Sequence, residues 1–220
     1  MPFRDRVDAG QKLAGALQKF SGADPVVYAL PRGGLPVGFE VAKALHCPLD
    51  IILVRKICAP FQPELALGAV VDGDHPEIVL NDFAMGLEPS EEAINAAAAL
   101  AMKEIERRRG IYLCGRHPEP ARGRTAILVD DGLATGATAR AAILALRRQQ
   151  PRHLVLAVPV APTESLAEMA AVVDEVVCLE AHDHFGAVGA YYKSFDQVTD
   201  QEVVAILGEA HATCQKPTTP

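Results

Sequence analysis

The sequence predicts an α/β fold in which an open, mostly parallel five-stranded sheet is flanked by helices. Continuous runs of Val, Ile, Leu and Ala alternate with stretches of helical spacing along most of the chain. This alternation is typical of strands that crossover helices bury on both faces. Half of the 220 residues are apolar, only 5% are aromatic and Trp is absent, which suits the core of such a fold.

The first elements follow from hydrophobic spacing. Apolar side chains recur at helical intervals in residues 3–20, so an amphipathic helix is expected there. The run PVVYALP at 25–31 predicts a buried strand that stops at Pro-Arg-Gly-Gly. Residues 35–45 return to helical spacing, and the second continuous apolar run, LDIILVRKI at 49–57, predicts the next strand.

The middle of the chain is the least regular part. Prolines and glycines interrupt residues 58–82, where the short runs LALGAVV and EIVL predict a hairpin. An Ala-rich stretch follows, from Glu91 to about Arg109, and predicts one long helix with Ser90 as its N-cap. The basic residues near its C-terminal end suit the helix dipole.

The second half of the chain repeats the strand and helix alternation. Further strands are predicted at 125–130, 153–160 and 174–180. Helical stretches separate them, at 137–150 and 163–171. Thr199 is the expected cap of a last short helix, and no repeat or composition break divides the chain. We therefore expect a single domain over residues 1–210, with a core of about 25–180, and a flexible tail at 211–220.

Composition also limits the partners. The formal net charge of −7 provides no positive field for nucleic acid or anionic lipid, so neither is an expected partner. Five scattered cysteines form no CxxC pair and suit a reduced cytoplasm. The charged N-terminus lacks a signal-peptide core, and no segment reaches the roughly 18 apolar residues of a membrane span, so a soluble cytoplasmic protein is expected.

The segment ILVDDGLATGAT, residues 127–138, carries the strongest functional signal. Asp130 and Asp131 end a predicted strand of a parallel sheet, where ligands bind. The small residues after them turn into a helix, whose backbone N–H groups and the Thr135 and Thr138 hydroxyls would hold a phosphate. Carboxylates beside a phosphate site suit ribose hydroxyls or a hydrated Mg²⁺. The segment thus predicts a ligand with several parts.

This segment resembles the phosphoribosyl pyrophosphate (PRPP) motif of type I phosphoribosyltransferases. It lacks the Lys of a Walker loop and the GxGxxG spacing of a Rossmann fingerprint. Two more segments are similar to the family at the expected places in chain order, ALPRGG at 29–34 and VRK at 54–56. The segments PELALGAV at 63–70 and VGAYYKSFDQVTDQEV at 188–203 resemble a bacterial subgroup of this family.

The resemblance implies the type I phosphoribosyltransferase-like fold, with a small hood formed by residues 1–24 and 181–210. It implies a loop for the 5′-phosphate of PRPP, made of Gly132, Leu133, Ala134, Thr135, Gly136, Ala137 and Thr138. It also implies a pyrophosphate site, made of Arg32, Gly33, Gly34, Arg55 and Lys56. Family members often hold a non-proline cis peptide in the first of these loops, which here falls near Arg32.

The implied activity is transfer of the 5-phosphoribosyl group from PRPP to a nitrogen acceptor, a nucleobase, with release of pyrophosphate. Mg²⁺ is the implied cofactor, held by Asp130 and Asp131 through ribose or water, and these acids orient the ribose. Lys56 joins them as a catalytic residue. Glu64, in the segment that matches the family's mobile loop, is the candidate acid or base. Ala134 stands where hypoxanthine and guanine enzymes have Asp, so the acceptor stays open.

Each expectation has an alternative. The chain would be a PRPP- or nucleotide-sensing regulator if it binds without turnover. If no ligand binds, the aspartates would be an ordinary helix cap, Arg55 and Lys56 a charged strand end, and Glu64 a surface residue. Residues 182–184, His-Asp-His, invite a metal interpretation, but adjacent side chains point to different sides. The long helix and residues 59–82 offer contacts for a homodimer.

Overall fold

The computed structural model describes residues 2–59, 62–72, 77–80, 91–113 and 118–214. Its main sheet has five strands in the order β2-β1-β6-β7-β8, and every neighbouring pair is parallel. Their bounds are β1 Pro25–Ala29, β2 Leu49–Ile51, β6 Thr125–Val129, β7 His153–Pro162 and β8 Glu175–His182. The predicted α/β fold with a parallel five-stranded sheet flanked by helices is confirmed.

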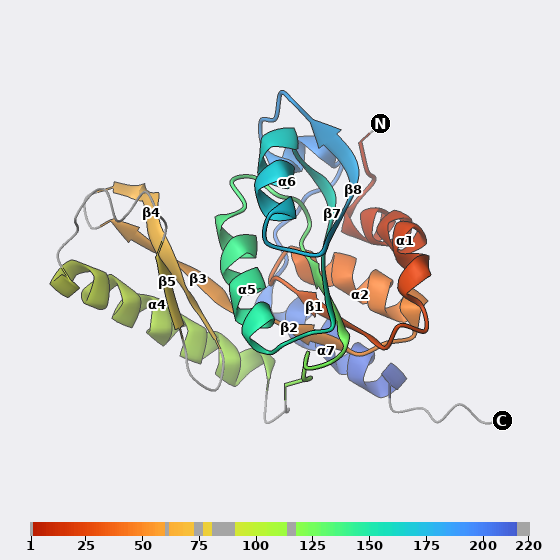
Figure 1. Cartoon of the computed structure of the whole chain (residues 1–220), viewed down its shortest axis with the longest axis horizontal. Coiled ribbons are helices and arrows are strands. Elements are labelled where there is room, and N and C mark those ends of the chain that lie inside the picture. Colours follow the sequence, from red (N-terminus) through yellow and green to blue (C-terminus); the bar gives the residue numbers. More distant parts are fainter. Residues whose placement is uncertain (1, 60–61, 73–76, 81–90, 114–117, 215–220) are drawn as a thin grey trace.

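Helices cover both faces of this sheet (Figure 1). One face carries α1 Arg6–Leu17, followed by the 3-10 turn η1 Gln18–Phe20, and α2 Gly34–Leu45. The other carries α5 Ala137–Arg148 and α6 Thr163–Ala170. Alternate strand residues face opposite sides. Val27 and Ile127 pack with the residues of α1 and α2, whereas Val26 and Leu128 pack with those of α5.

A second, antiparallel sheet forms an arm at the left of Figure 1. Its strands are β3 Val54–Ala59, β4 Gln62–Val71 and β5 Glu77–Leu80. The pairing of β4 with β5 confirms the predicted hairpin. Helix α4, Glu91–Tyr112, packs on this sheet through a shared cluster that includes Ile57, Val70 and Ile105. It ends three residues beyond the expected Arg109.

The strand predicted over residues 49–57 is wrong in one respect. The chain leaves the parallel sheet after β2 and enters the antiparallel sheet as β3, so one apolar run serves two sheets. Ile52 and Leu53, which link the two strands, are themselves buried. Because burial continues through the link, hydrophobicity alone does not mark the break. Consequently Arg55 and Lys56 lie on the arm and do not close a core strand.

The N-terminal segment pairs with the last residue of the 3-10 turn η2, Val188–Tyr191, and with the residues that follow this turn. Phe3 N donates to Tyr191 O at 2.8 Å, and Lys193 N donates to Phe3 O at 2.8 Å. Both segments fall within residues 1–24 and 181–210, which the resemblance assigns to a hood.

The last helix, α7 Asp200–Cys214, is capped by Thr199, whose Oγ1 accepts from Glu202 N. This confirms the predicted cap. The helix is longer than expected. Residues 211–214, which the sequence places in the flexible tail, form its C-terminal end. Among the described residues, no helix is long and apolar enough to cross a membrane.

Candidate active site

The two aspartates lie directly after β6, a strand whose five residues are all buried. The loop after β1 packs against them. A Cβ atom on Gly33 would lie 2.0 Å from Asp131 Oδ2, and one on Gly34 would lie 3.0 Å from Asp130 Oδ1. Only glycine permits this approach. The fold therefore brings the PRGG loop and the acid pair into direct contact, although they lie far apart in the sequence.

The electrostatics of the pair follow from burial. Burial raises the pKa of the Asp130 carboxyl well above its usual range, and the neighbouring Asp131 carboxylate adds to the rise. Burial also raises the pKa of Asp131, but there the Arg6 guanidinium opposes it. Asp130 is enclosed by protein on most sides yet borders an open pocket. A hydroxyl or cation that enters this pocket would meet the poorly solvated carboxyl group of Asp130, with Asp131 next to it in the chain.

Arg6, the first residue of α1, lies on the other side of Asp131. Its Nε donates to Asp131 Oδ2 at 2.7 Å, and its Nη1 donates to the carbonyl oxygen of Asp196 at 2.7 Å. The guanidinium carbon is 3.9 Å from the centre of the Phe195 ring. The charged side chains of Arg6 and Asp131 are mostly buried, with 12% and 13% of their surface exposed. The Tyr192 hydroxyl also donates to the Asp131 carbonyl oxygen.

The turn from β6 into α5 forms the floor of a pocket of about 160 Å³. Gly136, the residue before α5, has φ +70° and so occupies the left-handed region that favours glycine. Leu133 N donates to Val160 O, and the Ser165 hydroxyl donates to Ala134 O. These contacts fix the first half of the loop. The pocket is lined by Lys56, Asp130, Gly132, Leu133, Ala134, Thr135, Gly136, Ala137, Thr138, Ala139 and Val188.

Lys56 reaches this pocket from β3 of the arm. Its neighbour Arg55 is also exposed but does not line the pocket. Neighbouring residues of a strand point to opposite faces, so the register of β3 separates the two cations. The lysine thus adds a positive charge next to the start of α5, where the helix already favours an anion. This arrangement is chemically suited to a phosphate group.

Arg32 follows a cis peptide bond between Pro31 and Arg32, which confirms the expectation for this loop. Its Nη1 lies 3.5 Å from Asp200 Oδ1 at the start of α7. Asp200 also accepts from the Tyr112 hydroxyl, and Arg107 Nη1 lies 3.3 Å from its second oxygen. Arg32 is therefore held by a long ion pair, in the loop that contacts the acid pair and outside the pocket described above.

A family model described as the phosphoribosyl transferase domain matches residues 7–194, which include most of the elements described around this site. The chain belongs to this family.

Relatives of known sequence and structure agree with this assignment. Two proteins of Mycobacterium tuberculosis, from strains CDC 1551 and H37Rv, bear a provisional phosphoribosyl transferase name, and each is 46% identical over 209 residues. The match covers 95% of this chain and 47% of each relative, so the chain spans about half the length of these relatives.

Two solved structures are similar to this chain in fold. The crystal structure of TT1426 from Thermus thermophilus is 44% identical, with a TM-score of 0.83 over 95% of this chain and 99% of that one. The AQ2163 protein from Aquifex aeolicus shares the fold alone, with a TM-score of 0.52 at 11% identity over 84% of this chain and 78% of that one.

Two further expectations from the sequence concern Glu64 and residues 182–184. Glu64 is on β4, but its side chain falls outside the described part of the structure. The His182 ring packs on Tyr191, with centroids 4.5 Å apart. Among the described residues, no group of three or more His, Cys, Asp or Glu side chains is placed to hold a metal ion.

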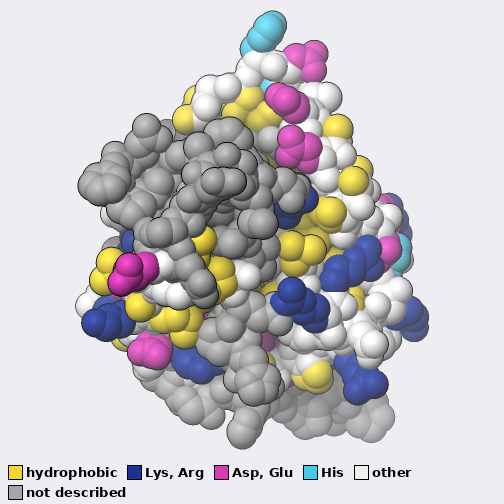
Figure 2. Space-filling view, turned by 60° about the vertical axis from the view of Figure 1, so that its left-hand side comes forward, with side chains coloured by type: hydrophobic (Ala, Val, Ile, Leu, Met, Phe, Trp, Pro, Cys, Tyr) yellow, Lys and Arg dark blue, Asp and Glu magenta, His cyan; other side chains and the backbone are white. Residues whose placement is uncertain are grey.

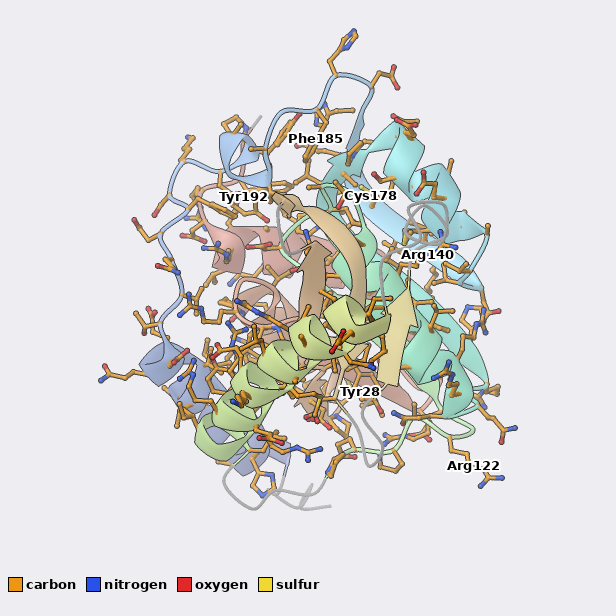
Figure 3. All side chains as sticks on the ribbon, turned by 90° about the vertical axis from the view of Figure 1, so that its left-hand side faces the viewer. Tyr28, Arg122, Arg140, Cys178, Phe185 and Tyr192 are labelled. Atoms are coloured by element: carbon orange, nitrogen blue, oxygen red, sulfur yellow. The ribbon has the colours of Figure 1, made fainter. Side chains whose placement is uncertain are left out.

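The aromatic residues of the C-terminal segment pack chiefly on one another. Phe185 stacks on Tyr191 with centroids 4.9 Å apart, and Tyr192 lies between Phe3 and Phe195, at 5.4 and 4.9 Å. Figure 3 shows Phe185 and Tyr192 at one end of the molecule, on the segment after β8. Tyr192 is only 6% exposed. These rings thus pack against other aromatic side chains of the protein.

Three residues of the site were missed by the sequence. Arg6 and Tyr192 contact Asp131, and Val188 lines the pocket and would touch a Cβ on Gly132. Arg6 begins an ordinary amphipathic helix, and nothing in its local sequence distinguishes it from the neighbouring Arg4. Contacts between such distant segments become visible only in the folded chain.

Proposed function

We propose that the chain binds PRPP with Mg²⁺ and transfers its 5-phosphoribosyl group to a nitrogen acceptor, a nucleobase, with release of pyrophosphate. One observation carries the proposal: a single pocket joins Asp130, Lys56 and the loop of residues 132–138 in a member of the phosphoribosyl transferase family. The parts of the ligand and the parts of the site have matching chemistry.

The 5′-phosphate would occupy the pocket at the start of α5. Backbone N–H groups there and the hydroxyls of Thr135 and Thr138 are donors suited to a dianion. Lys56, which the resemblance assigns to the pyrophosphate, lines this pocket, so we propose that its ammonium also contacts the 5′-phosphate. Gly132 and Gly136 permit the turn, and the side chain of Ala134 adds no charge. This part of the proposal explains why the pocket combines cationic and small residues.

The ribose would lie against the acid pair, with the pyrophosphate beyond it. Asp130 and Asp131 are acceptors for the sugar hydroxyls. Gly33 and Gly34, which contact these acids, would present their backbone to the pyrophosphate, with Arg32 beside them. Arg55, on the arm, would meet the leaving group only if the arm approaches. Cations and backbone donors at a leaving anion stabilise the transition state.

Magnesium suits the donors present. Asp130 and Asp131 offer hard carboxylate oxygens, and Mg²⁺ commonly takes one or two carboxylates together with ligand phosphates and water. Within the described part of the chain, no Lys or Arg forms an ion pair with Asp130. Burial and the neighbouring Asp131 disfavour its ionised form, and a cation nearby would stabilise that form. The ion would neutralise charge on the pyrophosphate.

A general acid or base for the transfer would come from outside the phosphate loop. Ala134 supplies no carboxylate to a base acceptor, so Glu64 on β4 is proposed for this role. A Glu64→Gln variant is expected to bind PRPP as the wild type does and to turn over more slowly. Equal turnover of the two proteins would remove Glu64 from the mechanism.

A homodimer is also proposed, through the arm. Apolar side chains lie at the surface on the face that carries it (Figure 2), and Leu100 on α4 is 69% exposed and Ile78 on β5 is 45% exposed. Sedimentation equilibrium tests this directly. A Leu100→Glu variant should shift the protein toward monomer, and a wild type that is already monomeric at micromolar concentration would exclude the dimer.

The activity is tested by pyrophosphate release. The purified chain is incubated with PRPP and Mg²⁺ and a panel of purine, pyrimidine and pyridine bases, with Thr138→Ala as the variant control. Release with one base, reduced at least about tenfold in the variant, is the expected result. Binding of PRPP without release for any base would favour a sensing regulator. A cytoplasmic location stays a prediction.

A further inference from the structure

The contacts of Arg6 differ from those of an ordinary helix residue. Its guanidinium has three neighbours from two distant segments, namely Asp131 Oδ2, the Asp196 carbonyl oxygen and the Phe195 ring. Arg4, two residues earlier, also pairs with an aspartate, but its side chain is 69% exposed. A mostly buried arginine that is engaged from several sides is fixed in one orientation.

This orientation determines that of Asp131. The acid is next to a like charge, and two such carboxylates repel each other. Arg6 Nε holds Oδ2 of Asp131, the Gly33 backbone closes one side, and the Tyr192 hydroxyl holds the main-chain oxygen of the same residue. Asp131 therefore has restraints on its side chain and on its backbone, and Arg6 supplies the hydrogen bond that holds its side chain.

Arg6 does not itself line the pocket of the phosphate loop. Asp131 does not line it either, but its neighbour Asp130 does, and Asp131 N donates to Asp130 Oδ1 at 2.9 Å. The hydrogen bond of Arg6 to Asp131 therefore links it to the acid pair at the edge of the pocket. Its other two contacts, with Phe195 and Asp196, lie in the C-terminal segment, which pairs with residues 3–4. The N-terminal helix and the C-terminal segment thus reach the acid pair through one side chain.

We propose that Arg6 is a positioning residue, which orients Asp131 to accept the sugar hydroxyls of the bound phosphoribosyl group. The inference rests on the proposed function and adds a residue outside the matched motifs. A carboxylate that is held in place before binding loses less side-chain freedom when the ligand arrives. The affinity gained from the sugar, beyond that gained from the phosphate, should then depend on Arg6.

The test compares two ligands that share the phosphate. Calorimetric affinities are measured for ribose 5-phosphate and for inorganic phosphate, and their ratio isolates the contribution of the sugar. The wild type should favour ribose 5-phosphate. In Arg6→Gln the ratio should fall by about tenfold, while the affinity for inorganic phosphate changes less than about twofold.

Three further variants make the result specific. Arg6→Lys keeps a cation near Asp131 and should restore part of the ratio. Arg4→Gln, the same change on the same segment, should match the wild type. Phe195→Leu removes the ring beside the guanidinium at a partly exposed position, and should lower the ratio by about threefold. It serves as the test if Arg6→Gln does not fold.

The outcomes separate the two proposals. A wild type that binds neither ligand nor PRPP overturns the proposed function, and the role of Arg6 with it. A wild type that binds, with an unchanged ratio in Arg6→Gln, overturns only the role of Arg6. An equal loss of affinity for both ligands would also overturn it, because Arg6 would then stabilise the fold without orienting Asp131. If Arg6→Gln does not fold, an unchanged ratio in Phe195→Leu would overturn the role of Arg6.

Discussion

Lys56 and Asp130 line the same pocket, although one lies on the antiparallel arm and the other follows β6 in the parallel sheet. A cation and a carboxylate therefore reach one ligand site from two different sheets. The chain achieves this by leaving the parallel sheet between Ile51 and Val54. The arm thus becomes part of the site.

Replacement of Lys56 is predicted to weaken phosphate binding. Lys56→Met removes the ammonium from the pocket and keeps most of the length of the side chain, so the affinity for ribose 5-phosphate, which has no pyrophosphate, should fall by about tenfold. Arg55→Met is the matched control, since Arg55 is adjacent but does not line the pocket. It should change the affinity by less than about threefold. Calorimetric titration checks both, and equal losses would contradict the assignment of Lys56 to the pocket.

Gly33→Ala is predicted to damage the acid pair. The new Cβ would lie 2.0 Å from Asp131 Oδ2, and Arg6 restrains that carboxylate, so the side chain has little freedom to move. We expect a lower Tm and PRPP affinity reduced by at least about tenfold.

Gly15→Ala is the control for this substitution. Gly15 lies in α1 and has no atom within 4 Å of the added Cβ. Alanine should therefore raise stability by about 0.5–1 kcal/mol and leave binding unchanged. Normal binding by Gly33→Ala would show that the PRGG loop does not constrain Asp131.

Asp130→Asn is predicted to stabilise the ligand-free protein while it weakens ligand binding. Burial raises the pKa of Asp130, so its ionised form is unfavourable in the folded state at neutral pH. A neutral amide of the same shape removes that cost. A gain of about 1 kcal/mol corresponds to a Tm increase of about 2–4 °C in a chain of this size. Binding should weaken because the amide has one acceptor oxygen fewer.

Thermal scans without Mg²⁺ and titrations with PRPP measure the two effects of Asp130→Asn. Asp183→Asn, in an exposed loop, should change neither. A fall in Tm together with weaker binding would indicate that the Asp130 carboxyl stabilises the fold. It would contradict the prediction that this residue lowers stability and strengthens binding.

The free energy of unfolding is predicted to fall at acid pH because of Asp174. The two Nη atoms of Arg147 each lie 2.8 Å from an Asp174 oxygen, and Leu154 N donates to it at 2.7 Å. The Arg147 guanidinium holds the pKa of Asp174 below its usual range. The folded state therefore binds the proton less tightly than the unfolded state, so this stabilisation exists above the unfolded pKa and is lost as pH falls through the folded one.

Asp174→Asn should accordingly lower Tm at pH 7, and the gap to the wild type should be smaller at about pH 3, below the unfolded-state pKa of about 3.9. Glu168→Gln, at an exposed position of α6, is the control and should have no effect at either pH. A gap that stays constant from pH 7 to about pH 3 would show that the hydrogen bonds of Asp174, and not its charge, support this corner.

Local pattern was sufficient for most elements of the core. Strands β1 and β6 are short runs in which every residue is buried, so hydrophobicity alone identifies them. Thr199 caps its helix as the sequence indicates. The acids at 130–131 and the small residues after them were recognisable because their chemistry is contiguous in the chain.

The features that the sequence did not predict depend on contacts between residues that are distant in the chain. The end of β2 lies in a run that stays buried into β3, so no change of polarity marks it. The difference between Arg55 and Lys56 depends on the register of the arm. The contact between Arg6 and Asp131 joins residues 125 positions apart and follows from the pairing of the chain's two end segments.

The most direct test of the account is isothermal titration of the purified chain with PRPP, in matched buffers with and without Mg²⁺. We predict saturable binding at one site per chain that is strengthened by Mg²⁺ and weakened at least about tenfold by Thr138→Ala. Absence of binding in both buffers, by a protein whose Tm shows that it is folded, would contradict the assignment of the pocket at Asp130 and Lys56 to a phosphoribosyl ligand.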